Sequence, residues 1–592
     1  MKSKLLALAA STLALTFAPA AAALAGDGSS ADQSASNAAN STATNTSTTD
    51  QSADQSQSSS SSCAYGCGGA GQAQVLEQDA DTNQSAASAA NAYQDAVNAN
   101  VPVTIGGGSV SGGDSSAAQN LSNEASSAAS NTSTTYQDAD QTQKAESDCK
   151  AGCGGAGQFQ ALEQDADTNQ KADSEANAKQ GAVNANVPVT IGGHKVGGGD
   201  SSAEQKLDNK AHSKASNTST TDQDADQSQK ADAKCDKGCG GAGQAQKLEQ
   251  DADTHQKADS EANAKQDAVN ANVPVAIGGK DVHGGDSSAK QKLDNEADSS
   301  ASNTSTTNQY ADQSQKADSD CKAGCGGAGQ FQALKQDADT NQKADSEANA
   351  EQNAVNANVP VTIGGGKVSG GDSSAEQKLD NEANSSASNT STTNQDADQH
   401  QSSSSSCEYG CGGSGQAQLL DQSASTNQHA NSEANAKQDA VNANVPVSIG
   451  GKDVDGGDNS ASQNAANSAT SAATNTSTTN QSANQTQSGG SGAGQFQAAS
   501  QSADTNQHAN STAIAGQTNV NANVPIVITI HTVIVVTPPS HGDHKADEPK
   551  AEEPRKEKKA RKAKKGKKAK KFGKKGKDRV GSLHGRHVAR LR

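Results

Sequence analysis

The sequence predicts a mainly β fold: a repetitive β-solenoid or amyloid-like array with low-complexity, partly disordered segments. Three observations point to this class. Charged residues alternate with uncharged ones, long blocks recur at a fixed step, and large apolar side chains are scarce, with no Trp and five Phe in 592 residues. The competing interpretation is a largely disordered chain with local helices, because such a composition is also typical of disordered proteins.

Charged residues keep to one parity over long stretches. From Ser201 to Lys234 all eleven are even-numbered, whereas the odd positions carry alanine, glutamine, asparagine, serine, threonine and one leucine, Leu207. From Glu163 to Lys179 the charges are odd-numbered instead. Period two is the side-chain period of an extended strand, and a helix would spread these charges around its circumference. The alternation therefore predicts strands with a solvated charged face and a packed uncharged face.

A helix over Ser202 to Ala215 is the main local alternative. Ser201-Ser202-Ala203-Glu204 matches a capping box, and Ala, Gln, Glu and Lys are good helix formers. The strand is favoured because Leu207 would be the whole apolar stripe of such a helix. An extended arm of about 30 residues would be roughly 100 Å long, far beyond ordinary strands. We therefore expect each arm to break at Gly, Asn and Asp positions.

The chain repeats with a step of 86 residues. Pairs of cysteines recur at this step, and so does the segment VNANVPV, which begins at residues 97, 183, 269, 355 and 441; a sixth copy, VNANVPI, begins at residue 520. The last step is 79 because the cysteine corner is shortened to SGGSGAGQ. Each unit contains a CxxxCGG(A/S)G corner, a first alternating arm, an NVPV segment with a Gly-rich turn, and a second alternating arm. Such periodicity is typical of stacked repeat proteins.

Stacking is expected to supply most of the stability. Burying an alanine methyl contributes under about 1 kcal/mol, so one unit is not expected to fold alone. Identical Gln and Asn side chains at a fixed step can form amide ladders about 4.8 Å apart.

The first 25 residues predict export. Lys2 and Lys4 precede an apolar run that ends at Ala23-Leu24-Ala25, the pattern of a signal peptide cut after Ala25. An uncleaved anchor is the alternative. No later run reaches the roughly 20 apolar residues of a membrane-spanning helix, so no transmembrane span is predicted.

The predicted divisions follow from these patterns. They are a signal peptide (1–25), a partial N-terminal repeat (26–62), repeats 1 to 5 (63–148, 149–234, 235–320, 321–406 and 407–489), a truncated repeat ending in a hydrophobic strand (490–537) and a disordered basic tail (538–592).

The hydrophobic end of the truncated repeat, Val524 to Thr537, is the most β-prone segment of the mature chain. It could nucleate assembly or bind a partner's edge. The alternative is a terminal capping strand.

Charge is segregated along the chain. Residues 545–592 contain 21 basic and 6 acidic residues, a net charge of +15, so the formal total of −19 leaves −34 on the rest. Behind a signal peptide, the expected partner of the tail is an anionic cell-wall polymer or another polyanion, bound in a salt-sensitive way. A merely solubilising tail is the alternative. The predicted polyanion-binding residues are Lys558, Lys559, Lys564, Lys565, Lys567, Lys568, Lys570, Lys571, Lys574, Lys575 and Lys577.

Ten cysteines in an exported chain predict disulfides. A bond within each CxxxC corner is the simplest connectivity, although closing an 86-residue loop would stabilise more, by about 4.6 against about 2 kcal/mol. A zinc site is disfavoured because no histidine recurs beside the corners, and a redox role because the spacing is not CxxC. The candidates are Cys63, Cys67, Cys149, Cys153, Cys235, Cys239, Cys321, Cys325, Cys407 and Cys411.

Other sites are weakly indicated. Asp222, Asp224 and Asp226 lack the Gly and bidentate Glu of an EF-hand loop, so no metal site is predicted. Thr218 and Thr220 form an outward T-x-T pair of the kind seen on ice-binding faces, but one pair per 86 residues is sparse. Histidines are sporadic, and nucleophile-elbow and phosphate-loop motifs are missing. We therefore expect no enzyme, no catalytic residue, no cofactor and no small-molecule substrate.

The segment Asn186 to Val196, NVPVTIGG-x-x-V, resembles the NVPV-x-V-x-G-x-x-V core of chaplins, the secreted amyloid-forming surface proteins of actinobacteria. Gly stands where chaplins often have Cys, and the paired Cys lies elsewhere. The spacing of Gln, Asn, Ser, Gly and Ala is similar to curlin repeats of bacterial amyloid fibres, although curlin units are shorter. Both resemblances imply extracellular self-assembly.

These features predict an extracellular structural protein of a bacterial cell surface, cell wall or matrix that self-associates through stacked β repeats and is tethered by its basic tail. The alternative is an adhesin or wall-binding stalk in which the repeats are a flexible, disordered spacer. Removing the tail distinguishes the two, because only the first expects fibres to form without it.

Overall fold

The computed structural model describes residues 29–530, except 67, 153, 239, 325, 411 and 490–493. These residues form 24 strands and no helix, arranged in parallel sheets. The predicted mainly β, repetitive fold is confirmed. The alternative of a largely disordered chain with local helices is wrong for this part of the chain, and the segment proposed as a helix, Ser202 to Ala215, lies within a strand.

Two sheets of long strands form the body of the array. The second-arm sheet contains, in spatial order, β1 (Ser29–Tyr65), β6 (Ser115–Ala151), β10 (Ser201–Lys237), β14 (Ser287–Ala323), β18 (Ser373–Tyr409) and β22 (Asn459–Gly489). The first-arm sheet contains β2 (Gly71–Asp79) and β3 (Thr82–Asn100) on one level, then β7 (Gly157–Asn186), β11 (Gly243–Asn272), β15 (Gly329–Asn358), β19 (Gly415–Asn444) and β23 (Gly494–Asn523).

Two sheets of short strands close the end opposite the cysteine corners. One contains β4 (Val103–Ile105), β8 (Val189–Ile191), β12 (Val275–Gly278), β16 (Val361–Gly364), β20 (Val447–Gly450) and β24 (Ile526–Thr529). The other contains β5 (Ser109–Ser111), β9 (Lys195–Gly197), β13 (Asp281–His283), β17 (Lys367–Ser369) and β21 (Asp453–Asp455).

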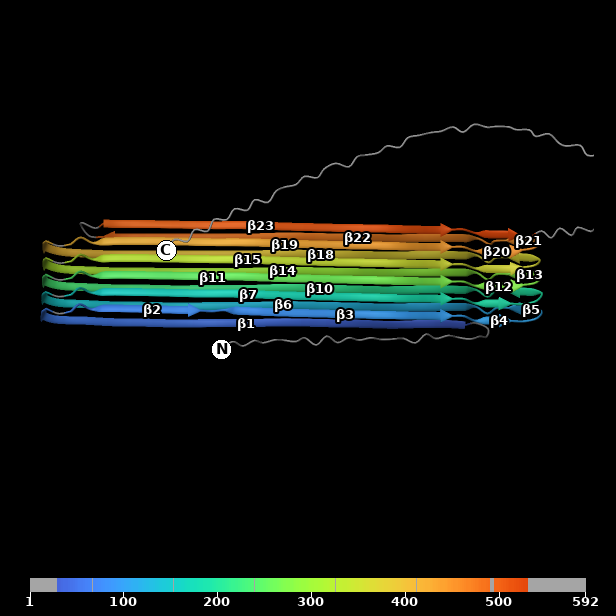
Figure 1. The fold of residues 1–592 in the computed structure, drawn as a ribbon, viewed down its shortest axis with the longest axis horizontal. Helices are drawn as coiled ribbons and strands as arrows, with labels where there is room; N and C mark the ends of the chain where they lie inside the picture. Colours follow the sequence, from blue (N-terminus) through green and yellow to red (C-terminus); the bar gives the residue numbers. More distant parts are fainter. Residues whose placement is uncertain are drawn as a thin grey trace, which may run out of the picture. The chain divides into compact units, whose positions relative to one another are not determined.

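Every strand lies directly on its own equivalent in the next repeat. Ser115 pairs with Ser29 and with Ser201, and all the ladders are parallel with this step of 86 residues. The last first-arm strand and the short strand after it differ, because Gly494 pairs with Gly415 and Ile526 pairs with Val447 at a step of 79. One turn of the solenoid, called a coil here, therefore equals one sequence repeat. Figure 1 shows the coils stacked from β1 in blue to β23 in red.

The predicted alternation of buried and exposed residues is confirmed. In β10 the odd-numbered residues are buried and the even-numbered, charged residues face solvent. In β7 the parity is reversed, as the sequence predicts. The charged faces of both long sheets therefore point outward, and their uncharged faces pack against each other.

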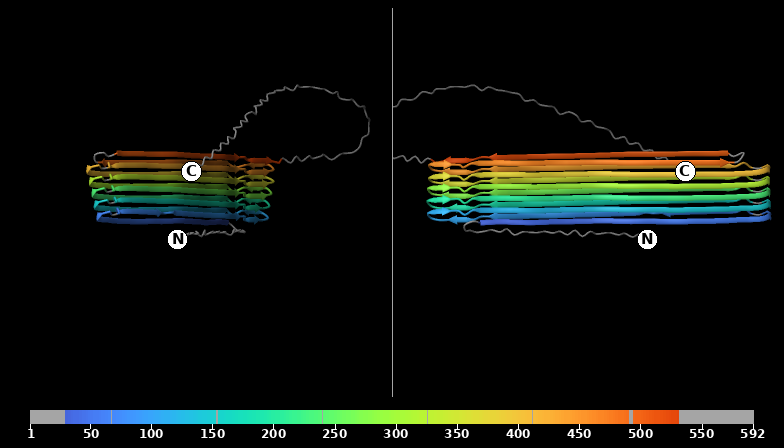
Figure 2. Two further views of the ribbon diagram at one scale, coloured as in Figure 1. Left: turned by 60° about the vertical axis from the view of Figure 1, so that its left-hand side comes forward. Right: turned by 180° about the vertical axis from the view of Figure 1, so that it is seen from behind.

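The expectation that each arm breaks into shorter strands is wrong. β10 runs for 37 residues and β11 for 30 without interruption, and Figure 2 shows the long strands running unbroken up to the short strands at one end of the array. At about 3.3 Å per residue, β10 is about 120 Å long. Only the first coil has a break, between β2 and β3. We attribute this continuity to the inward residues, most of which lie between identical residues of the neighbouring coils.

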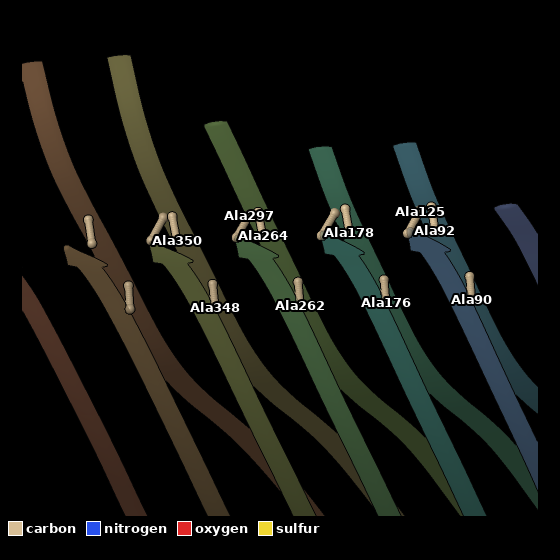
Figure 3. Close-up of a cluster of buried hydrophobic side chains, with 14 of the residues drawn as sticks. Ala90, Ala92, Ala125, Ala176, Ala178, Ala262, Ala264, Ala297, Ala348 and Ala350 are labelled. Carbon is tan, nitrogen blue, oxygen red and sulfur yellow. The ribbon is translucent and has the colours of Figure 1, made fainter. Parts of the chain in front are cut away.

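The core between the long sheets is made largely of alanine. One cluster contains Ala125 and its equivalents in the second-arm sheet, packed against Ala176 and Ala178 and their equivalents in the first-arm sheet (Figure 3). Leucine rows face alanine rows: Leu207 and its equivalents lie against Ala182 and Ala268, and Leu248 and its equivalents lie against Ala225 and Ala311. Small side chains thus let the sheets approach closely, and each large row meets a small one.

Glycine permits the sharp corner before each first arm. Gly152 and Gly238, which precede the second cysteine of their corners, have φ angles of 71° and 68°. A side chain is strained in this left-handed region. Two residues after that cysteine, Gly155 approaches the next coil so closely that an added Cβ would lie 1.9 Å from the Gly241 carbonyl oxygen. The corner sequence is therefore required by backbone packing.

Adjacent leucines in β19 test the packing. Leu420 is 3% exposed, whereas Leu419 points outward and is 39% exposed. We expect Leu420→Ala to lower the free energy of unfolding by about 2–5 kcal/mol, the usual range for a buried Leu. Leu419→Ala should change it by less than about 1 kcal/mol. Denaturant midpoints measured by circular dichroism compare the two, and equal midpoints would contradict the assignment of the inner face.

Candidate functional site

The buried amide side chains form continuous ladders along the stacking direction. In most columns, each buried glutamine after the first coil donates from its Nε2 to the Oε1 of its equivalent in the preceding coil. One such column is Gln78, Gln164, Gln250, Gln336, Gln422 and Gln501, with successive distances of 2.9, 2.9, 2.8, 2.8 and 2.6 Å. The amides of this column thereby find hydrogen-bond partners in the buried interior.

The same amides also join the two long sheets. Gln223 Nε2 in β10 donates to Gln137 Oε1 at 2.8 Å and also contacts two backbone oxygens of the first-arm sheet, those of Gln164 at 3.1 Å and Asp251 at 2.9 Å. The amide reaches that backbone because the intervening side chains are small. Glutamine therefore links successive coils and also joins the two long sheets.

The asparagines of VNANVPV join the first arm to the second. Asn184 Nδ2 contacts the backbone oxygens of Ala117 and Glu204 and donates to Asn270 Oδ1 at 3.0 Å. Asn186 Nδ2 contacts Ser201 Oγ at 2.9 Å. Sequence reasoning treated this segment as strand and turn and missed these cross-sheet contacts. The exact recurrence of VNAN in all six copies was the available signal.

The outer faces carry stacked charges, some of which are compensated between coils. Glu249 accepts from Lys247 at 2.9 Å and from Lys335 of the next coil at 3.0 Å. Glu351 lies between Lys265 and Lys437 of the adjacent coils, at 3.0 and 3.6 Å. These ion pairs are exposed, and each contributes little, about 0–1 kcal/mol.

Other columns bring like charges together. Asp79, Asp165, Asp251 and Asp337 stack in register on the outer face of the first-arm sheet. Partial burial, and then the Asp167 and Asp79 carboxylates, raise the pKa of Asp165 to about 6. Burial and neighbouring aspartates likewise raise the pKa of Asp251, and of Asp226 on the second-arm sheet, to about 6.

These carboxylates predict greater stability under mildly acidic conditions. Their folded-state pKa of about 6 lies above the unfolded value of about 3.9. The folded array therefore binds more protons between these pH values, and its free energy of unfolding rises as the pH falls from about 6 towards 4. We expect a higher Tm at about pH 5 than at pH 7.5 by thermal circular dichroism.

A triple variant checks the origin of this effect. Asp165→Asn, Asp226→Asn and Asp251→Asn together should raise the Tm at pH 7.5 and flatten its dependence on pH. The matched control is Glu249→Gln with Glu351→Gln, two residues that pair with lysines. This variant should not flatten the dependence of the Tm on pH between about 4 and 6, because the neighbouring lysines lower the pKa of both carboxyls. A wild-type Tm that is higher at pH 7.5 than at pH 5 would contradict the argument.

The T-x-T pairs become a two-dimensional grid. Thr46, Thr132, Thr218, Thr304, Thr390 and Thr476 stack in one outward column, and Thr48, Thr134, Thr220, Thr306, Thr392 and Thr478 stack in the next. Neighbours in a column are about 4.8 Å apart and the columns about 6.7 Å apart, from strand geometry. Pairs that are sparse along the chain are therefore dense on the second-arm sheet.

The first cysteines of the corners also stack, since Cys149, Cys235, Cys321 and Cys407 pair in register with their neighbours. Neither Cys235 nor Cys321, the two cysteines whose side chains the structure describes, is a free thiol. The second cysteine of each corner, namely Cys67, Cys153, Cys239, Cys325 and Cys411, lies outside the described residues. Disulfide connectivity within the corners stays a prediction, which peptide mapping under non-reducing conditions decides.

The predicted signal peptide and the eleven tail lysines lie outside the described residues, as do residues 531–537 of the hydrophobic segment. The described part of that segment includes β24, which pairs with β20. Over the described ranges, no group of three or more His, Cys, Asp or Glu side chains is placed to hold a metal ion. The part of the chain that the structure covers holds no helix able to cross a bilayer.

Comparisons with protein-family models, curated proteins and solved structures found no match to this chain.

Proposed function

We propose that the protein is a secreted structural component of a bacterial cell surface or extracellular matrix, which self-assembles through its stacked β repeats and is held in place by its basic tail. The observation that carries the proposal is the continuity of the amide ladders. A ladder gains one hydrogen bond per added coil and has no intrinsic end, as in cross-β assemblies.

The charge distribution supports the tethering role. The acidic residues are spread over the outer faces of the array, whereas a net charge of +15 is concentrated in residues 545–592. A cationic segment binds polyanions through counterion release, without requiring a defined pocket. Anionic wall polymers are the partners this chemistry favours outside the cell. The chaplin-like and curlin-like segments are consistent with the same location.

Removing the tail tests the proposal. Purified chain 26–592 and chain 26–544 should both form fibres, because the stacking residues precede the tail. Only the longer chain should be retained on a polyanionic resin, and added salt should release it. Electron microscopy and column retention measure the two properties separately.

A charge-preserving variant provides the control. Changing the eleven tail lysines to arginine should keep retention, and changing them to glutamine should abolish it. If chain 26–544 loses both retention and fibre formation, the adhesin or wall-binding stalk is supported instead. Equal retention of the two chains would contradict the tethering role.

The threonine grid favours a second candidate function, binding to an ordered surface such as ice. Its methyl and hydroxyl groups lie at fixed spacings on a straight sheet, which is suited to holding a regular layer of water.

Ice binding is tested by thermal hysteresis and by partition of the protein into growing ice. Thr218→Tyr with Thr304→Tyr places two bulky rings in the grid and should abolish both effects. The matched variant Asn169→Tyr with Asn341→Tyr lies on the outer face of the first-arm sheet and should retain them. Wild-type protein without hysteresis, or equal behaviour of the two variants, would exclude this function.

A further inference from the structure

Within the described residues, the array ends on both sides in the edges of long strands. The first coil (residues 29–111) has β1 and the β2–β3 level at its edge, and the last coil (residues 459–529) has β22 and β23 at its edge. Such edges present a row of backbone groups that another chain can pair with. Which chain fits is decided by the side chains between the two sheets.

Three glutamines of the first coil have amide nitrogens without a partner. Gln33 Nε2, Gln74 Nε2 and Gln94 Nε2 are buried atoms that make no hydrogen bond with the residues that the structure describes. Gln74 and Gln94 are only 4% and 2% exposed. In the next coil, the equivalent nitrogens of Gln119, Gln160 and Gln180 donate to these same three residues at 2.8, 3.0 and 2.8 Å. The unpartnered nitrogens are the starting ends of ladders that continue through the whole array.

The last coil offers the matching acceptors. Gln463, Gln497 and Gln517 end the same three columns, and each donates its own Nε2 to the preceding coil at 2.7, 2.8 and 2.5 Å. In every earlier coil the corresponding Oε1 accepts from the coil that follows. The last coil has none after it in the described array, so its three oxygens are available to the three unpartnered nitrogens.

The buried asparagines run in the opposite direction and match as well. Asn98 donates to Asn184, and Asn442 donates to Asn521 of the last coil, both at 3.0 Å. Among the described residues, Asn98 Oδ1 therefore accepts from no asparagine of a preceding coil. Asn521 Nδ2 donates to no asparagine of a following coil, although it contacts the backbone oxygen of Ala461 at 3.3 Å. Donors meet acceptors in both kinds of ladder only when a first coil lies on a last coil.

The register is the same in both long sheets. Ser29 and Asn459 occupy one column, separated by five steps of 86 residues, and Gly71 and Gly494 occupy another, separated by four steps of 86 and one of 79. In this register the inward glutamines and asparagines of β1 meet identical residues of β22: Gln33 and Gln463, Asn37 and Asn467, Asn45 and Asn475, Gln51 and Gln481, Gln55 and Gln485, and Gln57 and Gln487.

The short strands add apolar contact at the same place. Val103 and Ile105 of β4 are 39% and 73% exposed, and Ile526 and Ile528 of β24 are 39% and 45% exposed. The short-strand sheet has the same steps as the first-arm sheet, four of 86 residues and one of 79. In the continued stack, Val103 would therefore lie over Ile526 and Ile105 over Ile528. Stacking would reduce the exposure of both pairs, as it does for Ile191, the equivalent of Ile105 in the second coil, which is 36% exposed.

We propose that copies of this chain stack head to tail, the first coil of one copy resting on the last coil of the next with Ser29 over Asn459 and Gly71 over Gly494. This inference rests on the proposed self-assembly and specifies its interface. The contact is heterologous, so it repeats without closing and produces a filament. Head-to-head contact is disfavoured because it would set the glutamine donors of two first coils against each other.

Two variants of chain 26–592 test the interface. Gln74→Glu with Gln94→Glu removes donors from the first coil but keeps the oxygens that accept from Gln160 and Gln180. Gln497→Lys with Gln517→Lys removes acceptors from the last coil. Each variant alone should need at least about tenfold more protein to form filaments, because buried ladder groups lose their partners. A 1:1 mixture should assemble again, since each variant supplies an intact end and the altered ends have opposite charges.

Charge-matched variants on the outer faces serve as controls. Asn83→Asp with Asn91→Asp in β3, and Asn506→Lys with Asn510→Lys in β23, should assemble like the wild type. If either ladder variant alone also assembles like the wild type, or if the mixture does not assemble, head-to-tail stacking is wrong.

A cross-link provides a second measurement that does not depend on these variants. Ser30 and Ser460 face outward in one column, so Ser30→Cys with Ser460→Cys should form a disulfide between copies in filaments, because neighbouring strands lie within the Cα range of a disulfide. Ser30→Cys with Ser468→Cys should not. The reverse result would overturn the register. Wild-type protein that forms no filaments would refute the proposed self-assembly itself, whereas filaments without this cross-link would refute only the interface.

Discussion

The structure depends on hydrogen bonds between identical amide side chains in successive coils. A glutamine that faces the core must find an amide above and below it, because a buried amide without partners costs about 1–3 kcal/mol. This requirement fixes the repeat length and the inward residues together. The column through Gln250 holds glutamine in every coil, whereas the outward column through Lys290 also contains Ala118, Glu204 and Glu376. Variation is concentrated on the outer face, although the inward row through Leu121 also contains Ala35 and Ala465.

Small residues make these ladders effective in two directions. The alanine rows around Ala176 and Ala211 keep the two sheets close, so that an amide such as that of Gln223 reaches the opposite backbone as well as its own column. A core of larger side chains would bury more apolar surface but would separate the sheets. The array therefore combines modest hydrophobic burial with many satisfied polar contacts, a balance in which each coil is stable chiefly because of its neighbours.

Much of this arrangement could be predicted from the sequence, because period-two charge patterning assigns each residue of β10 to a face and the step of 86 assigns its partners. The uninterrupted length of the arms could not, since the usual limits on strand length come from sheets whose strands differ from one another. The contacts of Asn184 with Ala117 and Glu204 also escaped prediction, because they depend on which positions of the two arms face each other. The threonine pairs appeared sparse because distance along the chain conceals their proximity in the stack.

The register that aligns amides also aligns charges, and the two effects oppose each other. A column of glutamines becomes more satisfied with each coil, whereas a column of aspartates such as Asp79, Asp165, Asp251 and Asp337 becomes more repulsive. Changes of sign between coils relieve this repulsion, as where Glu351 lies between Lys265 and Lys437. The outer faces are therefore free to vary in residue type but not in charge balance. The amide ladders favour unlimited stacking of identical coils. The stacked aspartates oppose this stacking when they are ionised, so pH acts on the assembly through the acidic columns.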